Sequence, residues 1–437
     1  MAERRVFGLL LLLYLFSAFA YSQLIPSWEG PDEPAHYILA LNLARIGVFS
    51  TLERNYEAHQ PQTYYRIAQF PLRWLYLQDR DSVAYYRPPA DYGNVRKPAP
   101  IFEWTAESYR FLPGLFVLRM LNILFGAGAL LLNYAGLRYF VSGRVALSAV
   151  IFAGFIPQYL HTVSTVNNDA FGILIGAFLF WLVVRLDRGG TSPALRVASF
   201  PVVVILPFVS KLTVLPVSLA VICAWLIDIG YRQRTRMILL ISGSIVTLGV
   251  FAIVFSRLEP GLAEQLGREL VWRAFAVRPD AFSAGYLSEV VSQIVWSFWG
   301  KVGWLAVGLP GSLVGILTLL ALGGAVANFR VVFLRTRDGD LSEPLIPKAA
   351  WIFPWLAVLF VLAAVIKNGL VTINSQGRFL FPALGPMALI IVSGWDRLLP
   401  DRFRRFLFPG LFLLMLLINL VLIIGGILPV YYQPFLD

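Results

Sequence analysis

The sequence predicts an all-α integral membrane protein, a bundle of about eleven transmembrane helices. Hydrophobic residues make up 58% of the 437 residues, charged residues only 14%, and the mean hydropathy is +0.70. Many apolar runs approach the roughly 20 residues that a helix needs to cross a bilayer. Basic residues recur in every second short loop between these runs, which is the pattern of a multi-pass topology. These observations exclude a soluble globular protein.

The apolar runs place the expected spans along the chain. They are 6–25, 113–134, 145–160, 170–184, 195–209, 212–229, 237–255, 302–327, 349–366, 379–395 and 406–428. We treat 1–437 as one polytopic domain with two long extracytoplasmic loops, 26–112 and 257–301, which carry amphipathic helices. Pro201, Pro207 and Pro216 favour broken helices in the fifth and sixth spans. No internal repeat of the kind found in many secondary transporters is evident.

The basic loops also set the expected orientation, because Lys and Arg favour the cytoplasmic side. With Arg4 and Arg5 inside, the two long loops and the C-terminus face outside. The same alternate loops carry Arg138, Arg144, Arg185, Arg188, Arg196, Arg232, Arg234, Arg236, Arg330, Arg335, Arg337, Arg397, Arg402, Arg404 and Arg405. The net charge of +11 is therefore a topology signal, and we expect no nucleic-acid partner.

The first apolar run and the single cysteine both lie in predicted spans. The first apolar run could be a signal peptide, but Ser17–Ala20 is only a weak cleavage site, so we read a retained helix. The single cysteine, Cys223, lies in an apolar run, which excludes an internal disulfide and a thiol–metal cluster.

The stretch from Trp28 to Tyr37 concentrates ionisable groups directly after the first span. Gly30-Pro31 breaks the chain, Asp32 can cap a new helix over 32–46, and Pro34 suits its first turn. At helical spacing, Asp32, Glu33 and His36 can share one face. Ionisable groups where a helix leaves the bilayer indicate a functional site. The alternative is a capped turn before a surface helix.

Other polar residues on the expected outer face are candidates for binding substrate. Asn168 and Asp169 precede an apolar helix, where a helix cap is the plainer reading. Lys211 stands in an apolar stretch, as a phosphate-binding cation or as a side chain that snorkels to the interface. Arg378, beside Gln376, stands against the positive-inside bias and suits bidentate phosphate binding, or else anchors the helix. His59 lies in a Tyr-bearing segment suited to sugars or to the membrane interface.

Together these motifs resemble a bacterial membrane-protein family of unassigned activity placed near the GT-C glycosyltransferases. That superfamily includes protein O-mannosyltransferases, lipid A aminoarabinose transferases and oligosaccharyltransferases. The resemblance covers most of the chain and rests on Pro31–His36, His59-Gln-Pro61, Asn167–Asp169, Lys211, Ser297–Trp304 and Gln376–Pro382. Gln62 departs from it, since a second proline would be expected after Pro61.

The resemblance implies a GT-C-like fold and an inverting transfer of a sugar from a polyprenyl-phosphate donor at the outer face of the bacterial cytoplasmic membrane. Asp32 would be the general base, and Glu33 or His36 would orient it or share the proton. Lys211 and Arg378 would hold the donor phosphate. Asp169 would bind sugar hydroxyls or a divalent cation, for which magnesium or manganese would suit an oxygen-rich site; whether a metal is needed stays open. The acceptor would be an envelope glycan, lipid or protein.

Two other functions stay open at this point. A transporter or flippase for a lipid-linked sugar would use the same cations but needs polar groups near mid-bilayer, where Arg119 is the only candidate. A non-catalytic envelope assembly protein would tolerate loss of Asp32, Glu33 and Asp169.

Overall fold

The computed structural model describes residues 2–49, 55–77, 111–187, 193–232, 276–330 and 349–433, with a few single positions between 242 and 275. Its elements are α1 (Ala2–Leu24), α2 (Glu33–Ile46), η1 (Tyr56–His59), α3 (Thr63–Trp74), α4 (Pro113–Phe140), α5 (Gly143–Gly154), α6 (Pro157–Val163), α7 (Asp169–Asp187), α8 (Pro193–Val209), η2 (Leu212–Val214), α9 (Leu215–Arg232), α12 (Ala284–Trp299), β1 (Lys301–Val302), β2 (Val307–Gly308), α13 (Gly311–Phe329), α14 (Ala349–Val371), η5 (Gly377–Ala383), α15 (Leu384–Leu398), α16 (Asp401–Arg404), α17 (Leu407–Leu422), η6 (Ile423–Ile427) and α18 (Leu428–Tyr432).

The helical bundle agrees with the predicted fold class. Within the described part of the chain, seven helices are long and apolar enough to cross a membrane, and the bent pair α5 and α6 makes up to eight. The pair bends by 66° just before Pro157, which begins α6 and cannot continue α5. α8 and α9 are shorter apolar helices, and the predicted span 237–255 falls almost wholly outside the described residues. The predicted total of eleven is therefore not established.

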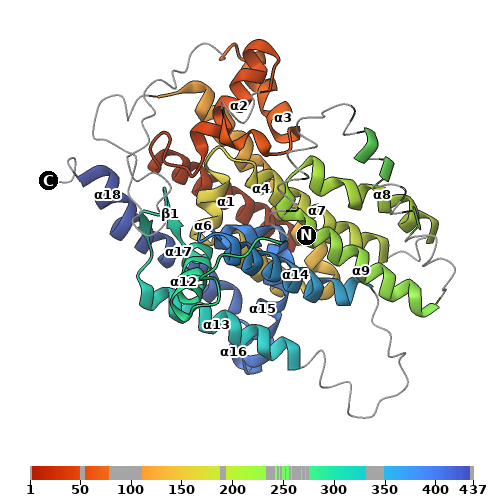
Figure 1. Ribbon diagram of the computed structural model, residues 1–437. Helices are drawn as coiled ribbons and strands as arrows, with labels where there is room; N and C mark the ends of the chain where they lie inside the picture. Colours follow the sequence, from red (N-terminus) through yellow and green to blue (C-terminus); the bar gives the residue numbers. More distant parts are fainter. Residues whose placement is uncertain are drawn as a thin grey trace.

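The described parts of the first long loop form a helical cap on one end of the bundle. Figure 1 shows α2 and α3 above α1 and α4, with α13, α15 and α16 toward the opposite end. The predicted helix over 32–46 is confirmed as α2, but ten of its 14 residues are buried. It packs against α3, where Tyr64, Tyr65 and Leu72 are buried. α2 is thus a core element and does not lie as an isolated amphipathic helix on a surface.

The second long loop and the span after it begin differently from the prediction. α12 lies within the predicted loop, and a two-stranded antiparallel hairpin, β1–β2, follows it, so the next span starts at Gly311 and not at residue 302. Apolar residues of the hairpin had extended the hydropathy signal. Trp304 in its turn donates from Nε1 to the carbonyl of Trp28, at 3.0 Å. Tyr431 of α18 donates to Glu29 Oε2 at 2.8 Å, so α18 and the hairpin both hold the first loop.

Close helix packing positions the short helix η5. A Cβ atom added to Gly176 of α7 would lie 2.1 Å from the carbonyl oxygen of Pro382, so only glycine allows this approach. η5 also carries Arg378, which is thereby fixed beside the start of α7.

Candidate active site

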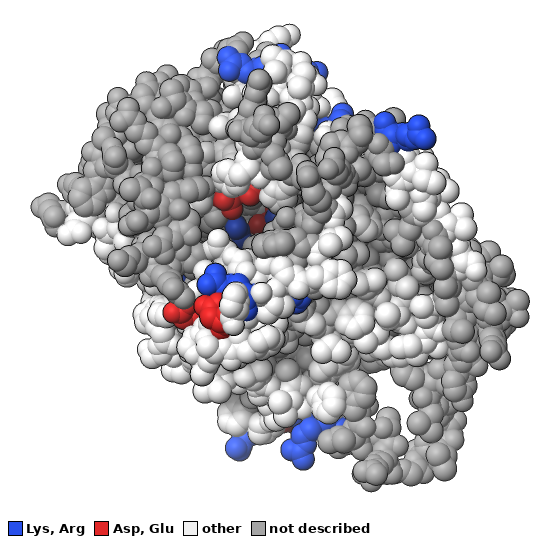
Figure 2. Space-filling view, in the orientation of Figure 1, with Lys and Arg blue, Asp and Glu red and all other residues white. Residues whose placement is uncertain are grey.

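A cavity of about 310 Å³ opens where α2, η1, η2, the start of α7 and η5 meet α14. Its charged and histidine side chains are Asp32, His36, Glu57, His59, Asp169, Lys211 and Arg378. Figure 2 shows acidic and basic atoms together in a hollow below α2 and α3, while most of the described surface in this view is uncharged. Residues far apart in the sequence therefore meet in one polar cavity at the end of an apolar bundle.

Asp32 owes its position in the cavity to an unusual backbone conformation. It precedes α2 at the N-cap position with φ 61° and ψ 7°, in the left-handed region, and its side chain makes no capping hydrogen bond. The predicted position is confirmed, but the predicted capping role is wrong. Its Oδ1 accepts a hydrogen bond of 3.0 Å from the hydroxyl of Tyr56. Left-handed backbone is costly for residues other than glycine, although Asp tolerates it better than most.

A chain of alternating charges crosses the cavity. Arg378 lies 3.6 Å from the nearest carboxylate oxygens of both Asp32 and Asp169. Lys211 Nζ lies 2.7 Å from Asp169 Oδ1 and donates to Asn168 Oδ1 at 2.5 Å. Except for Asp32, whose side chain is 27% exposed, the charged side chains of this chain are at least nine-tenths buried. Because 3.6 Å is too long for a hydrogen bond, Arg378 is held by charge while its donors stay available.

Two donors at this place have no hydrogen-bond partner among the described residues. They are Nε of Arg378 and the hydroxyl of Thr213, which follows Lys211 in η2. Buried polar groups are usually paired, so such exceptions call for an explanation.

His36 and Glu57 line the same cavity as these cations. His36 Nδ1 shares a 2.8 Å hydrogen bond with the Tyr65 hydroxyl, and its Nε2 lies 4.0 Å from Glu57 Oε2. Burial, followed by the nearby Lys211, holds the pKa of His36 well below its usual value. Burial, followed by the Asp32 carboxylate, raises the pKa of Glu57 to about 7. His36 is thus neutral at physiological pH and Glu57 titrates there.

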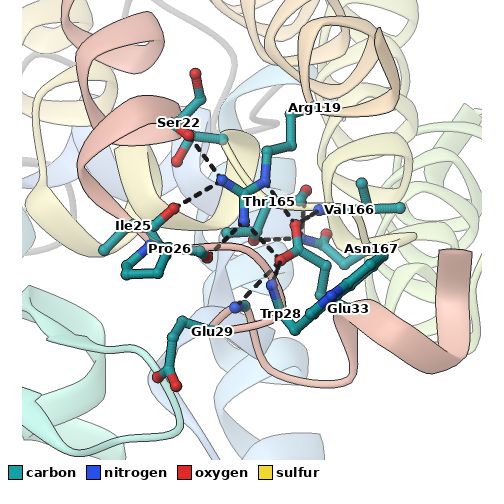
Figure 3. A network of polar contacts seen from close by, with 12 residues as sticks. Ser22, Ile25, Pro26, Trp28, Glu29, Glu33, Arg119, Thr165, Val166 and Asn167 are labelled. Atoms are coloured by element: carbon teal, nitrogen blue, oxygen red, sulfur yellow. Dashed lines mark hydrogen bonds and ion pairs between the residues drawn. The ribbon is translucent and has the colours of Figure 1, made fainter. Parts of the chain in front are cut away.

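Glu33 does not line the cavity, although its spacing from His36 predicts a shared face. It is fully buried and forms a two-point ion pair with Arg119, at 2.8 Å and 2.7 Å (Figure 3). Arg119 also donates to the carbonyls of Ser22, Ile25 and Pro26, which uses all five of its N–H groups. Glu33 also accepts from the backbone N–H groups of Trp28, Gly30 and Val166. This arrangement fixes the loop and leaves no group for substrate.

The remaining predicted residues lie at or near the cavity. His59 lines it and donates from Nδ1 to the carbonyl of Tyr56, at 2.8 Å. Asn168 accepts a hydrogen bond from Lys211 and donates one to Gln60 Oε1 at 3.1 Å. Gln376 does not line the cavity, and its buried Oε1 has no partner among the described residues.

Sequence reasoning missed Glu57 and Thr213 as cavity residues. Each stands two positions from a predicted residue, Glu57 before His59 and Thr213 after Lys211. This proximity was the only available signal.

The side chains of the cavity suit an anion better than a divalent cation. No group of three or more His, Cys, Asp or Glu residues in the described ranges is arranged to hold a metal ion. Two of the three carboxylates that could serve as oxygen ligands, Asp32 and Asp169, already face Arg378 and Lys211, whose charges would repel a metal. We therefore derive no chemical step through the magnesium or manganese ion considered from the sequence.

Comparison with solved structures identifies the fold. The protein is similar to ArnT from Cupriavidus metallidurans bound to undecaprenyl phosphate (TM-score 0.51) and to the same protein in the apo state (TM-score 0.53). Sequence identity is 12% in both, and the matches cover 97% and 98% of this chain and 74% of each ArnT chain. No protein-family model matches the sequence, and no curated protein matches it significantly. The protein is therefore a multi-pass membrane protein with an ArnT-like fold.

Proposed function

We propose that the protein is a membrane glycosyltransferase that moves a sugar from a polyprenyl-phosphate donor to an acceptor hydroxyl, with inversion. The observation that carries this proposal is the buried chain of Asp32, Arg378, Asp169 and Lys211 in one cavity of an ArnT-like fold. The reaction takes place at the outer face of the bacterial cytoplasmic membrane, with an envelope glycan, lipid or protein as acceptor.

Lys211 and Arg378 hold the donor phosphate. Both are buried and line the cavity, and the terminal nitrogens of Arg378 lie 3.6 Å from the nearest carboxylate oxygens, too far for hydrogen bonds that would compete with phosphate oxygens. Arg presents a planar fork that matches phosphate, and Lys adds a point charge. As the sugar–phosphate bond breaks, these cations stabilise the charge that develops on the departing polyprenyl phosphate.

Asp32 acts as the general base. The acceptor oxygen bonds to C1 of the sugar, the C1–O bond to phosphate breaks with its electron pair leaving on the phosphate, and the hydroxyl proton passes to Asp32. Tyr56 orients the carboxylate, and neutral His36 lines the same cavity. Asp169 anchors Lys211 and can bind sugar hydroxyls. Glu33, which the sequence placed with the catalytic residues, serves as the structural partner of Arg119.

An apolar cavity next to the polar one suits the lipid part of the donor. It measures about 260 Å³, is lined almost wholly by apolar side chains of α12, α13, α14 and α15, and shares Val361 with the polar cavity. A polyprenyl chain lying there would bring its phosphate toward Lys211 and Arg378. One of the similar ArnT structures is bound to undecaprenyl phosphate, a lipid of this class.

The test uses purified protein in liposomes with a panel of labelled polyprenyl-phosphate monosaccharides and envelope extract as acceptor. We expect release of free polyprenyl phosphate that requires Asp32, so that Asp32→Asn abolishes it. Movement of labelled lipid between leaflets without consumption of any donor would replace this proposal with a flippase or transporter.

A further inference from the structure

Glu57 lines the cavity at a fixed position, but it takes no part in the proposed transfer reaction. Its backbone N–H donates to Asn55 Oδ1 at 2.9 Å, so Asn55 caps the short helix η1. The amide of Asn55 in turn donates to the carbonyl of Ala35, also at 2.9 Å. These two bonds tie η1 to α2, and the Glu57 side chain lies in the cavity, with the whole residue only 9% exposed.

The surroundings of this carboxyl group do not offer it a direct cationic partner. Among the described residues, the nearest ion-pair contact is neutral His36, at 4.0 Å. Lys211 and Arg378 act on it through space but are engaged by Asp169 and Asp32. Other groups near it are the Asp32 carboxylate, the Tyr65 phenol and the Gln60 amide, which hydrogen-bonds to it. His59, two positions further along η1, lines the same cavity and pairs with Gln60.

Charge counting indicates which form of Glu57 suits an anionic substrate. The two carboxylates Asp32 and Asp169 balance the two cations Lys211 and Arg378. An ionised Glu57 would add a further negative charge in a buried site and repel a phosphate. A protonated Glu57 would leave the site neutral and add a hydrogen-bond donor, because a carboxylic acid donates where a carboxylate only accepts.

We propose that Glu57 works as a neutral carboxylic acid that donates a hydrogen bond to the phosphate of the lipid-linked substrate, beside Lys211 and Arg378. This role rests on the proposed function and adds a binding residue to it. Burying a carboxyl group among other carboxylates is a known way to keep it protonated near neutral pH. Burial and Asp32 raise the pKa of Glu57 to about 7, and a bound phosphate raises it further.

The consequence is that phosphate binding takes up a proton. Affinity is highest where Glu57 is already protonated, below pH 7, and it falls as the pH rises and the proton must be supplied from solution. This sign is opposite to that expected for a carboxylate acting as a base, which works better as the pH rises.

The test measures binding of a short-chain polyprenyl methyl phosphate to the full-length protein in detergent, without any turnover. This diester carries one negative charge at all the pH values used, so its own titration does not contribute. We expect the wild type to lose about tenfold in affinity between pH of about 6 and about 8.5. Glu57→Gln, whose amide donates at every pH, should keep the low-pH affinity to within about threefold throughout. Glu289→Gln, which changes an exposed carboxylate on α12, is the matched control and should behave as wild type.

A second variant keeps the proposal testable if Glu57→Gln does not fold. The Gln60 hydrogen bond favours the ionised form of Glu57, so Gln60→Ala should move the fall in affinity to higher pH. The inference is wrong if wild-type affinity does not change with pH, or if Glu57→Gln keeps the wild-type pH dependence. If the wild type does not bind the diester at any pH, the proposed function itself fails. Binding that depends on Lys211 but not on Glu57 leaves the proposed function intact and removes only this role.

Discussion

Two adjacent carboxylates, Asp32 and Glu33, stand in opposite environments. Glu33 is fully buried and every donor of its partner Arg119 is used, in hydrogen bonds of 2.7–2.9 Å. Asp32 lines a cavity, lies 3.6 Å from Arg378, and shares that arginine with Asp169. Every donor of Arg119 in the Glu33 pair is used within the protein. In the Asp32 pair, Nε of Arg378 has no hydrogen-bond partner among the described residues.

The difference shows how one turn can serve both structure and function. A saturated ion pair has no capacity for a ligand, and breaking it leaves a buried charge uncompensated. A loose pair with unused donors contributes less to stability but is ready to bind a charged group. The left-handed backbone at Asp32 separates the two side chains, so that one faces the bundle and the other the cavity. The same conservative change should therefore have opposite results at the two positions.

Glu33→Gln should produce the largest effect on folding. It leaves the Arg119 guanidinium buried without a counter-charge, at a cost of about 3–5 kcal/mol. Thermal unfolding of the detergent-solubilised variant should show a large drop in Tm or a failure to accumulate. The double variant Glu33→Leu with Arg119→Met should recover part of this loss, because neither charge is then buried alone. An unchanged Tm for Glu33→Gln would show that the pair is not structural.

Asp32→Asn, one residue earlier, should leave the Tm close to that of wild type and remove activity. Loss of a general base typically lowers the rate by about 10²–10⁴-fold. The measurement is kcat for release of polyprenyl phosphate, with the unfolding curve of the same preparation as the control. Activity within tenfold of wild type would assign the base to another group in the cavity.

Replacing Glu57 by Gln should change the free energy of unfolding by a smaller amount, which depends on pH. Its pKa is about 7 in the folded protein against 4.5 for the free side chain, so folding takes up a proton between these values. The contribution of Glu57 to stability is therefore greatest below pH 4.5 and is lost as the pH rises to about 7. Relative to Glu57→Gln, the wild type should lose up to about 3 kcal/mol across this window. A constant difference between the two unfolding curves would contradict the raised pKa.

The smallest predicted effect on stability comes from the left-handed backbone conformation at Asp32. At φ 61°, an L-residue without a compensating side chain is strained by roughly 1–2 kcal/mol relative to glycine. Asp32→Gly should therefore unfold at a higher temperature than Asp32→Ala, although both lack the carboxylate and both should be inactive. Equal Tm values would show that the surrounding loop relaxes to relieve the strain.

The sequence predicts the fold class because hydropathy directly reports burial in a bilayer. It also locates most of the cavity, since Asp32, His36, Asp169, Lys211 and Arg378 are unusual in an apolar chain. It places the start of one span wrongly, because the residues of the β1–β2 hairpin are as apolar as a helix end. Hydrophobic periodicity and hydropathy are properties of local sequence, so they predict the elements whose structure local sequence determines.

The roles within the Asp32–His36 turn could not be predicted in this way. Helical spacing places Glu33 with His36, but the position of Glu33 is decided by Arg119, 86 residues further along the chain. Likewise, the raised pKa of Glu57 comes from its burial and from the nearby Asp32 carboxylate, and only the folded chain creates this environment. Long-range contacts thus separate the structural carboxylate from those in the cavity.

The bond between Glu29 and Tyr431 joins residues 402 positions apart and has a consequence for biosynthesis. The turn that carries Asp32 is synthesised well before Arg378 and before the helix that anchors the turn, α18. The cavity therefore has no complete wall while the chain is being inserted. A chain that stops before Arg378 lacks one wall of this cavity and the helix that anchors the turn.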